Sequence, residues 1–571
     1  MSAAPIAASP RPVFVECSRR LDMKKRSLRP DTWGALHDAP ALAAAPPYQR
    51  ALDYFPALLA AIAICGLLSA ISVFVPPFIH WDSGWGFLAW RGTLMGAPNS
   101  IVTPDPANIA RDTAGFLTEW SPGQYLIPGA IALTGIPLGI AMTLTAALSL
   151  LASLVGWVVF VKSFTPRTSL ALLAVLLIAL FRYSTMPFGV YQGGEILLQA
   201  ATPWLLLAVF QIPEMDGAPA ALFAAGAVLV AFLAKLTGLI VVVAALVASS
   251  VVALAFRRRI TRGMIGGALG GVAALVVLFA TFLSRGPTAV SEMSWSLPFR
   301  SIAFAFLVPW VAGLSWTDLM ITIFLPGRSL FYTSPAVVGL AIPPALLVMG
   351  LIVFWQPQAI KEEKLKLYSL VFYGIVAAVF VLLFIRGRGV SLEERHFRPA
   401  GTLVFVCALV SAFAIRTPRW TRCLFLILCA LMALYGVASF SSRAMGAAQG
   451  QSLDRTSWTN QQIYDPAAVD FARAAYAREG RDALFVLPTP QIPVTLPADA
   501  RILTRDLEWG EPAAARPSLR YAGRVAGHVF VLLPNSLSDT SKARGLLSAF
   551  TDYPPDGWQK KKFANMSVFF Q

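Results

Sequence analysis

Asp82 stands directly after the first long apolar segment of the chain, in the sequence IHWDSGW at 79–85. A carboxylate among aromatic rings at a membrane surface loses part of its hydration and becomes a stronger base. Such a group could take the proton of an attacking hydroxyl while a lipid-linked reactant lies alongside. The structural alternative is an aromatic belt at the interface, with Asp82 capping a helix of the loop.

Arginines cluster around 386–398, in the sequences RGR and EERHFRP, between two other apolar segments. The guanidinium group keeps its charge and binds phosphate in a planar, two-pronged geometry. The residues Arg388, Arg395, His396 and Arg398 are therefore candidate ligands of a phosphate headgroup. The alternatives are internal pairing with Glu393 and Glu394, or contact with ordinary lipid headgroups.

Glu195 in YQGGE and Lys235 in AKLTG also lie at the ends of apolar segments. Charged groups in lipid are costly and usually face a cavity or a partner. We take Glu195 as a second candidate catalytic carboxylate and Lys235 as a candidate phosphate ligand. Favourable placement of Glu195 in a first helical turn and snorkelling of Lys235 are the structural alternatives.

Aromatic residues near these groups are candidate contacts for a sugar, whose CH faces pack on rings. The candidate acceptor or sugar contacts are Trp81, Trp85, Glu119, Trp120 and Tyr125. The neighbouring sequence SPG at 121–123 is typical of a turn.

The sequence shows no metal site. Its five cysteines and four histidines form no CxxC pair and no Cys/His cluster, which argues against structural zinc. No cofactor is identified, and the use of a divalent metal is left open.

Composition indicates that the elements positioning these groups are membrane helices. Of the 571 residues, 57% are hydrophobic and only 13% are charged, too few charges for a soluble protein of this size. Apolar runs of bilayer length are predicted at 54–76, 136–160, 167–186, 194–212, 218–234, 238–256, 263–284, 335–355, 369–385, 399–415 and 423–440. The segments 124–135 and 301–325 are re-entrant, interfacial or spanning, so we expect a mainly α bundle of about 11 to 13 spans.

Charge predicts the orientation of the bundle. The net charge is +16, and basic clusters occur in the tail 1–50 and at 257–262, 361–366 and 416–422. Cytoplasmic loops carry such clusters, so we expect a disordered cytoplasmic tail at 1–50 and a membrane domain at 51–440. The long loop 77–123 and the C-terminus then lie outside, in what is most simply a bacterial inner membrane.

Residues 441–571 change character. Short apolar runs near 483–487, 501–504, 525–533 and 567–570 alternate with helical patterns near 466–478 and 540–550, which predicts a small extracytoplasmic α/β domain. It lacks a phosphate loop, a G-x-S-x-G elbow and an H-E-x-x-H motif, so no catalytic site is predicted in it.

The arrangement resembles GT-C-type glycosyltransferases, and is most similar in pattern to bacterial aminoarabinose and protein O-mannosyl transferases. Asp82 matches the acidic residue of their first outer loop, and Glu195 an acidic position at the second. The sequence RHFRP at 395–399 is similar to their arginine-aromatic-proline segment, and Lys235 falls where relatives carry a Lys-Gly or Lys-Thr-Gly turn.

The resemblance implies a hexosyl or pentosyl transferase. It would use a polyisoprenyl-phosphate sugar donor and a glycan, lipid or protein acceptor on the outer side, among membrane lipids and without nucleic acid. Two alternatives stay open: a transporter or flippase for a lipid-linked or anionic solute, and a non-catalytic assembly protein. Transporters usually show internal repeats, which this sequence lacks.

Overall fold

The structure is a computed structural model, and it describes most of the chain. The described residues are 47–105, 107–286, 298–324, 335–386, 392–449, 453–460, 465–491, 495–504, 518–521 and 526–571. The residues described between 55 and 571 belong to one compact unit. Almost all of the predicted tail, and Arg388, lie outside the described residues.

Nine helices of the described residues are long and apolar enough to cross a membrane. They are α1 (Pro47–Phe74), α4 (Leu138–Phe164), α7 (Gly194–Gln211), α8 (Gly217–Ala234), α9 (Gly238–Arg257), α10 (Arg262–Thr281), α13 (Pro335–Val353), α14 (Ile360–Ile385) and α16 (Arg419–Gln449). Within the described chain the number of spans rises to eleven if two bent helix pairs count as one span each, which is the lower end of the predicted range.

The first bent pair joins α5 (Thr168–Leu180) to α6 (Arg182–Thr185) and the 3-10 helix η2 (Met186–Phe188) at 63°. The second joins α11 (Phe299–Val311) and η5 (Ala312–Leu314) to α12 (Trp316–Phe324) at 98°. This second pair occupies the segment 301–325, whose role the sequence left open. Its sharp bend occurs at Ser315, which has φ 61°.

Two predicted apolar segments form helices too short to span lipid by themselves. The predicted span at 399–415 is α15 (Arg398–Ala412), with 15 residues, and the segment 124–135 holds α3 (Gly123–Ala132), with 10 residues. Every residue of α15 after Arg398 is buried. Other helices surround α15. This helix therefore does not need the length that would cross the hydrocarbon core of a membrane.

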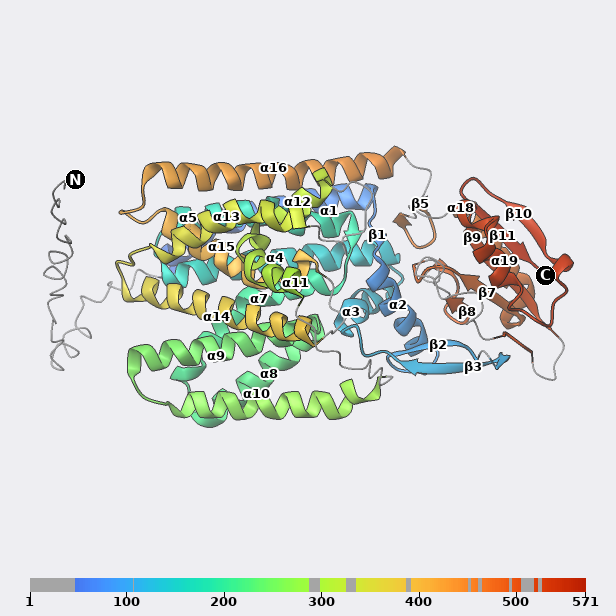
Figure 1. The fold of residues 1–571 in the computed structure, drawn as a ribbon, viewed down its shortest axis with the longest axis horizontal. Helices are drawn as coiled ribbons and strands as arrows, with labels where there is room; N and C mark the ends of the chain where they lie inside the picture. Colours follow the sequence, from blue (N-terminus) through green and yellow to red (C-terminus); the bar gives the residue numbers. More distant parts are fainter. Residues whose placement is uncertain are drawn as a thin grey trace, which may run out of the picture. The chain divides into compact units, whose positions relative to one another are not determined.

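The bundle separates the basic segments from the candidate site (Figure 1). The α9–α10, α13–α14 and α15–α16 connections, which carry the clusters at 257–262, 361–366 and 416–422, lie at one end of the bundle. The starts of α7 and α15 and the C-terminal domain lie at the other. The basic connections and the C-terminal domain therefore lie at opposite ends of the bundle.

The predicted outer loop 77–123 is ordered, which its sequence did not indicate. It contains β1 (Phe78–Ile79), α2 (Trp81–Leu94), β2 (Ser100–Asp105) and β3 (Asn108–Phe116). Strands β2 and β3 form an antiparallel hairpin. His80 is the N-cap of α2, because its side chain accepts a hydrogen bond from the backbone N–H of Asp82. Asp82 therefore lies in the first turn of α2 and is not the cap.

The C-terminal domain is built on a five-stranded sheet with the order β10-β11-β9-β7-β8. Its elements are α17 (Pro466–Glu479), β7 (Ala483–Leu487), β8 (Arg501–Thr504), β9 (His528–Pro534), α18 (Asn535–Ser538), α19 (Ser541–Leu547), β10 (Gln559–Lys562) and β11 (Met566–Phe570), after a small β5 (Leu453–Asp454) and β6 (Thr459–Asn460) pair. Strand β7 pairs parallel with β8 and β9, whereas β11 pairs antiparallel with β9 and β10. Two hydrophobic clusters, one with α17 and one with α19, pack against the sheet.

Short 3-10 helices complete the described chain. They are η3 (Ile212–Glu214), η4 (Leu283–Arg285), η6 (Glu394–His396), η7 (Gly480–Asp482) and η10 (Pro555–Gly557).

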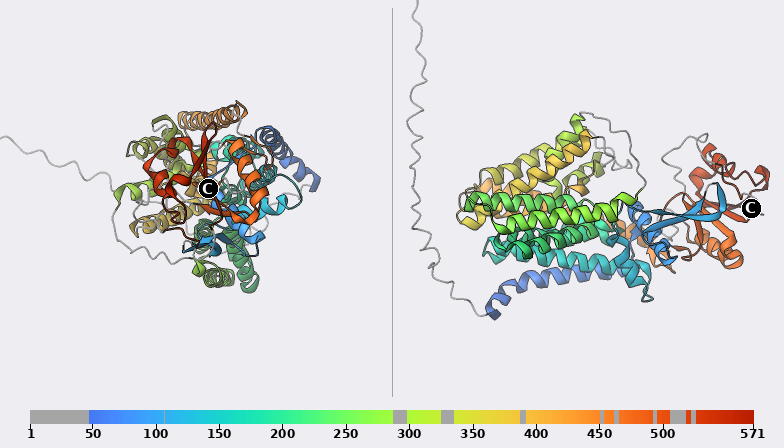
Figure 2. Two further views of the ribbon diagram at one scale, coloured as in Figure 1. Left: turned by 90° about the vertical axis from the view of Figure 1, so that its right-hand side faces the viewer. Right: turned by 90° about the horizontal axis from the view of Figure 1, so that it is seen from below.

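The outer loop lies beside the C-terminal domain (Figure 2), and polar contacts join the two. Arg91 of α2 donates hydrogen bonds to the carbonyls of Leu496, Pro497 and Ala500 at 2.7, 2.6 and 3.1 Å. Burial lowers the pKa of Arg91 to about 10. In the hairpin, Asp112 pairs with Arg501 at 2.9 Å. The C-terminal domain is thus fixed to the same loop that carries Asp82.

Candidate functional site

Two short strands bring the segments of Asp82 and Glu195 together. Strand β1 pairs parallel with β4 (Val190–Tyr191), with Ile79 opposite Tyr191. Asp82 follows β1 by three residues and Glu195 follows β4 by four. Ser83 strengthens the junction by donating its hydroxyl to the carbonyl of Tyr191 at 3.0 Å.

Glycines at the start of α7 permit this close approach. Gly193 has φ 60°, and a Cβ there would lie 2.8 Å from Cβ of Gln124. A Cβ on Gly194 would lie 3.0 Å from the carbonyl oxygen of Ala234, at the end of α8. A side chain at Gly194 would push α7 away from the end of α8, and with it Glu195 away from Lys235, whereas a side chain at Gly193 would collide with Gln124 of α3.

The guanidinium of Arg395 is the centre of the site. Its Nη1 lies 2.6 Å from Oδ2 of Asp82 and 3.2 Å from Oε1 of Glu195, and its Nε lies 2.6 Å from Oε2 of Glu393. Asp82 and Arg395 are 313 residues apart in sequence. The structure therefore brings together the candidate base and a candidate phosphate ligand that sequence analysis assigned separately.

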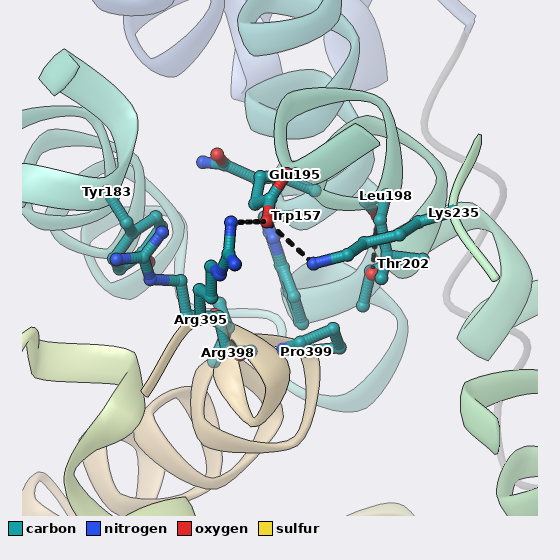
Figure 3. A pocket seen from close by; sticks show the side chains of 11 residues that line it. Trp157, Tyr183, Glu195, Leu198, Thr202, Lys235, Arg395, Arg398 and Pro399 are labelled. Carbon is teal, nitrogen blue, oxygen red and sulfur yellow. Dashed lines mark hydrogen bonds and ion pairs between the residues drawn. The ribbon is translucent and has the colours of Figure 1, made fainter. Parts of the chain in front are cut away.

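Lys235 completes the cluster from the side of α8. Its Nζ lies 2.7 Å from Oε1 of Glu195, so Glu195 receives Arg395 and Lys235 on one carboxylate oxygen (Figure 3). Lys235 is thus held in the site by an ion pair and does not snorkel to the membrane surface. Glu195 lies in the first turn of α7, which also agrees with a favourable interaction with the helix dipole.

The cluster fixes the charge states of its neighbours outside the spans. Burial opposes the charge of Arg395, but Glu195, Glu393 and Asp82 outweigh it and raise its pKa. Burial lowers the pKa of His80, against the opposing effect of Asp82. Burial, reinforced by Lys235 and Arg395, also holds the pKa of His396 well below its usual value. His396 is therefore neutral and brings no charge to a phosphate.

A second cluster surrounds Asp318 of α12, which is 5% exposed. The carboxylate of Asp318 pairs with Arg182 of α6 and, at 3.0 Å, with Arg398 at the start of α15. The backbone N–H of Asp318 donates to Oε2 of Glu394 at 2.9 Å. Burial, and then the charge of Asp318, raise the pKa of Glu394 well above its usual value. The carboxylate of Asp318 is thus shared by two guanidinium groups.

The two clusters differ in charge balance. Around Arg395, three carboxylates face the two cations Arg395 and Lys235. Around Asp318, two arginines face one carboxylate. An added anion is therefore attracted more to Arg398 than to Arg395, because three carboxylates already contact Arg395.

A small cavity lies between these groups. Its polar lining includes Glu195, Lys235, Arg395 and Arg398, and its apolar lining includes Trp157 (Figure 3). A second small cavity is lined by Arg182 and Asp318, and it shares Arg395 and Arg398 with the first. An apolar pocket with converging cations suits a lipid that ends in phosphate.

The predicted aromatic contacts are divided between the surface and the core. Trp85 stacks on Trp120, with ring centroids 6.4 Å apart, and meets Trp81 edge-on at 6.5 Å. These three rings are partly exposed beside Asp82, and Glu119 is exposed. Tyr125 is 0% exposed and packs in a hydrophobic cluster, so its ring supports the loop and does not face a cleft.

Sequence analysis missed Asp318 and Arg182. Each is an ionisable residue in a segment that was treated only as apolar, and a buried charge in such a segment usually has a partner. That signal was available, but the sequence did not show which residue was the partner, because Asp318 and Arg398 are 80 residues apart.

Among the described residues, no group of three or more His, Cys, Asp or Glu side chains is placed to hold a metal ion.

Comparison with solved structures shows which fold this is. No protein-family model and no curated protein sequence matches the chain. The structure of ArnT from Cupriavidus metallidurans bound to undecaprenyl phosphate is similar, with a TM-score of 0.51 and 13% identity over 90% of this chain and 97% of that one. The apo form of that ArnT gives a TM-score of 0.50 with 12% identity over the same shares. The mycobacterial arabinofuranosyltransferase AftD gives 0.43 with 14% identity, over 90% of this chain and 39% of that one.

The chain therefore has the GT-C-type fold that the sequence motifs predicted, in an integral multi-pass membrane protein with a small C-terminal α/β region. At this level of identity the likeness concerns the fold, and the chemistry must be argued from the residues.

We predict that Asp318→Ala destabilises the protein by about 3–5 kcal/mol, because it leaves two buried guanidinium groups without their carboxylate. The measurement is the thermal unfolding of the purified full chain. Asp216→Ala is the control, since Asp216 is exposed and caps α8 without a side-chain hydrogen bond; it should change stability by less than about 0.5 kcal/mol. Equal melting temperatures for Asp318→Ala and wild type would contradict the assignment.

Proposed function

We propose that the protein is a membrane glycosyltransferase that moves a sugar from a polyisoprenyl-phosphate donor to an acceptor hydroxyl, at the end of the bundle that carries the C-terminal domain. The observation that carries this proposal is the 2.6 Å contact between Asp82 and Arg395. Through it, a candidate base is attached to an arginine that lines an apolar, cationic cavity.

The cavity is the donor site in this proposal. Trp157, Leu198 and Pro399 offer apolar surface to the first isoprene units, and Lys235 and Arg398 offer charge to the phosphate. Arg398 is the principal ligand, because it shares the single carboxylate of Asp318 with Arg182. The related ArnT fold was solved with undecaprenyl phosphate bound, which supports a lipid-linked donor.

Asp82 is the general base. The acceptor hydroxyl loses its proton to the Asp82 carboxylate as its oxygen bonds to the anomeric carbon of the sugar. The bond between that carbon and the phosphate oxygen breaks, and polyisoprenyl phosphate leaves with one additional negative charge. Arg398 and Lys235 stabilise this developing charge, and direct displacement inverts the anomeric centre. Arg395 holds the carboxylates of Asp82 and Glu195 in position through its contacts with both.

The aromatic residues Trp81, Trp85 and Trp120 lie on the acceptor side of Asp82 in this scheme. Their partly exposed rings give a surface on which a sugar of the acceptor or donor can pack. The C-terminal domain is close enough to frame this surface, since a Cβ on Gly84 would lie 2.9 Å from the backbone of Pro490.

The reaction is placed on the extracytoplasmic side of a bacterial inner membrane. The basic segments at the far end of the bundle support this orientation, because cytoplasmic loops are rich in Lys and Arg. The N-terminus is then cytoplasmic and the C-terminal domain lies outside.

Asp82→Asn tests the base. We expect transfer from a polyisoprenyl-phosphate sugar in isolated membranes to fall by about 100-fold or more, because the amide cannot take the acceptor proton. Asp105→Asn, in the hairpin of the same loop, is the matched control and should retain activity. Wild-type transfer rates in correctly inserted Asp82→Asn would remove the catalytic assignment.

Arg398→Ala tests the phosphate site. We expect kcat/KM for the donor to fall about 10- to 100-fold, as befits the loss of a charge-assisted hydrogen bond, with a much smaller change in the acceptor KM. Arg398→Lys, which keeps the charge but loses the two-pronged geometry, should lie between this variant and wild type. Equal effects on donor and acceptor would argue against phosphate binding by Arg398.

A further inference from the structure

A further cavity of about 430 Å³ lies at the opposite end of the bundle, between the end of α13 and the start of α16. Its lining is mainly apolar and includes Leu346, Leu347, Leu351 and the buried Trp355, and the exposed Arg416 lies at its rim. It shares no lining residue with the candidate active site. We call it the α13–α16 groove.

The rim of the groove carries a cation without a carboxylate partner. Arg416 is exposed, and its side chain donates to the amide oxygen of Gln356. Among the ion pairs of the described chain, none involves Arg416. A neutral amide holds the guanidinium in place but leaves its charge uncompensated, so the rim attracts an anion.

Trp355 adds an independent observation. Its side chain lines the groove and is 4% exposed, yet its indole Nε1–H has no hydrogen-bond acceptor among the described residues. A buried N–H without an acceptor is costly, and buried tryptophans usually find one. The backbone at this site is fixed, because Lys366 donates to the carbonyls of Val353 and Trp355 at 2.8 and 2.7 Å.

We propose that the α13–α16 groove binds an anionic phospholipid of the leaflet opposite the active site. The phosphate oxygens accept from Arg416 and from the indole N–H of Trp355, and an acyl chain lies along Leu346, Leu347 and Leu351. The apolar lining of the groove favours a lipid over a free anion, because a free phosphate would leave the apolar side chains exposed to water. The uncompensated arginine selects an anionic lipid over a zwitterionic one.

The test is native mass spectrometry of the purified full chain with phosphatidylglycerol or phosphatidylcholine added. We expect tighter binding of phosphatidylglycerol, and about fivefold weaker binding in Arg416→Gln. Trp355→Phe keeps an aromatic ring but removes the N–H donor, and should weaken binding severalfold. Gly350→Leu should prevent binding by filling the groove, since a Cβ at Gly350 meets no atom closer than 4.0 Å.

Arg259→Gln is the matched control, because Arg259 is an exposed arginine at the same end but outside the groove. It should bind phosphatidylglycerol as wild type does. Equal losses in Arg259→Gln and Arg416→Gln would reduce the effect to general surface charge and overturn the site. Equal binding of the two lipids, unchanged binding in Gly350→Leu, or displacement of phosphatidylglycerol by inorganic phosphate at equal concentration would also overturn it.

Discussion

The guanidinium of Arg395 is the interaction on which the site depends. It joins Asp82, Glu195 and Glu393, and these come from three parts of the chain that only folding brings together. A buried arginine is costly unless carboxylates surround it, and buried carboxylates are costly without a cation. Each partner therefore requires the others, and the start of α2, the start of α7 and the segment before α15 are fixed as one assembly.

This assembly leaves a division of charge that suits the proposed chemistry. The carboxylate-rich side contains Asp82 and meets the outer aromatic rings, whereas the cation-rich side contains Arg398 and meets the apolar cavity. A hydroxyl that must lose a proton belongs on the first side, and a phosphate that must leave belongs on the second. Arg395 separates the two and contacts both. The bent pair of α11 and α12 contributes to the same division, because it carries Asp318 beneath Arg398.

Much of the fold could be predicted from the sequence, because a long apolar run in a membrane protein forms a membrane-spanning helix. The same patterns could not reveal that the loop 77–123 forms regular secondary structure. That structure depends on the β1–β4 pairing and on contacts such as the hydrogen bond from Arg91 to the C-terminal domain. Residue type and position marked Asp82, Glu195, Lys235, Arg395 and Arg398 as candidates, and their roles stay predictions. The partners escaped prediction, since Asp318 lies in an apolar segment and Tyr125 gives no sign in sequence that it is buried.

The most direct test of this account is an electron cryo-microscopy map of the full chain in lipid nanodiscs with a polyisoprenyl phosphate bound. The account predicts the phosphate within hydrogen-bond distance of Arg398 and Lys235, with Arg395 still in contact with Asp82. A phosphate bound elsewhere in the bundle, or an Arg395 that leaves Asp82 to bind it, would contradict the central role given to this ion pair.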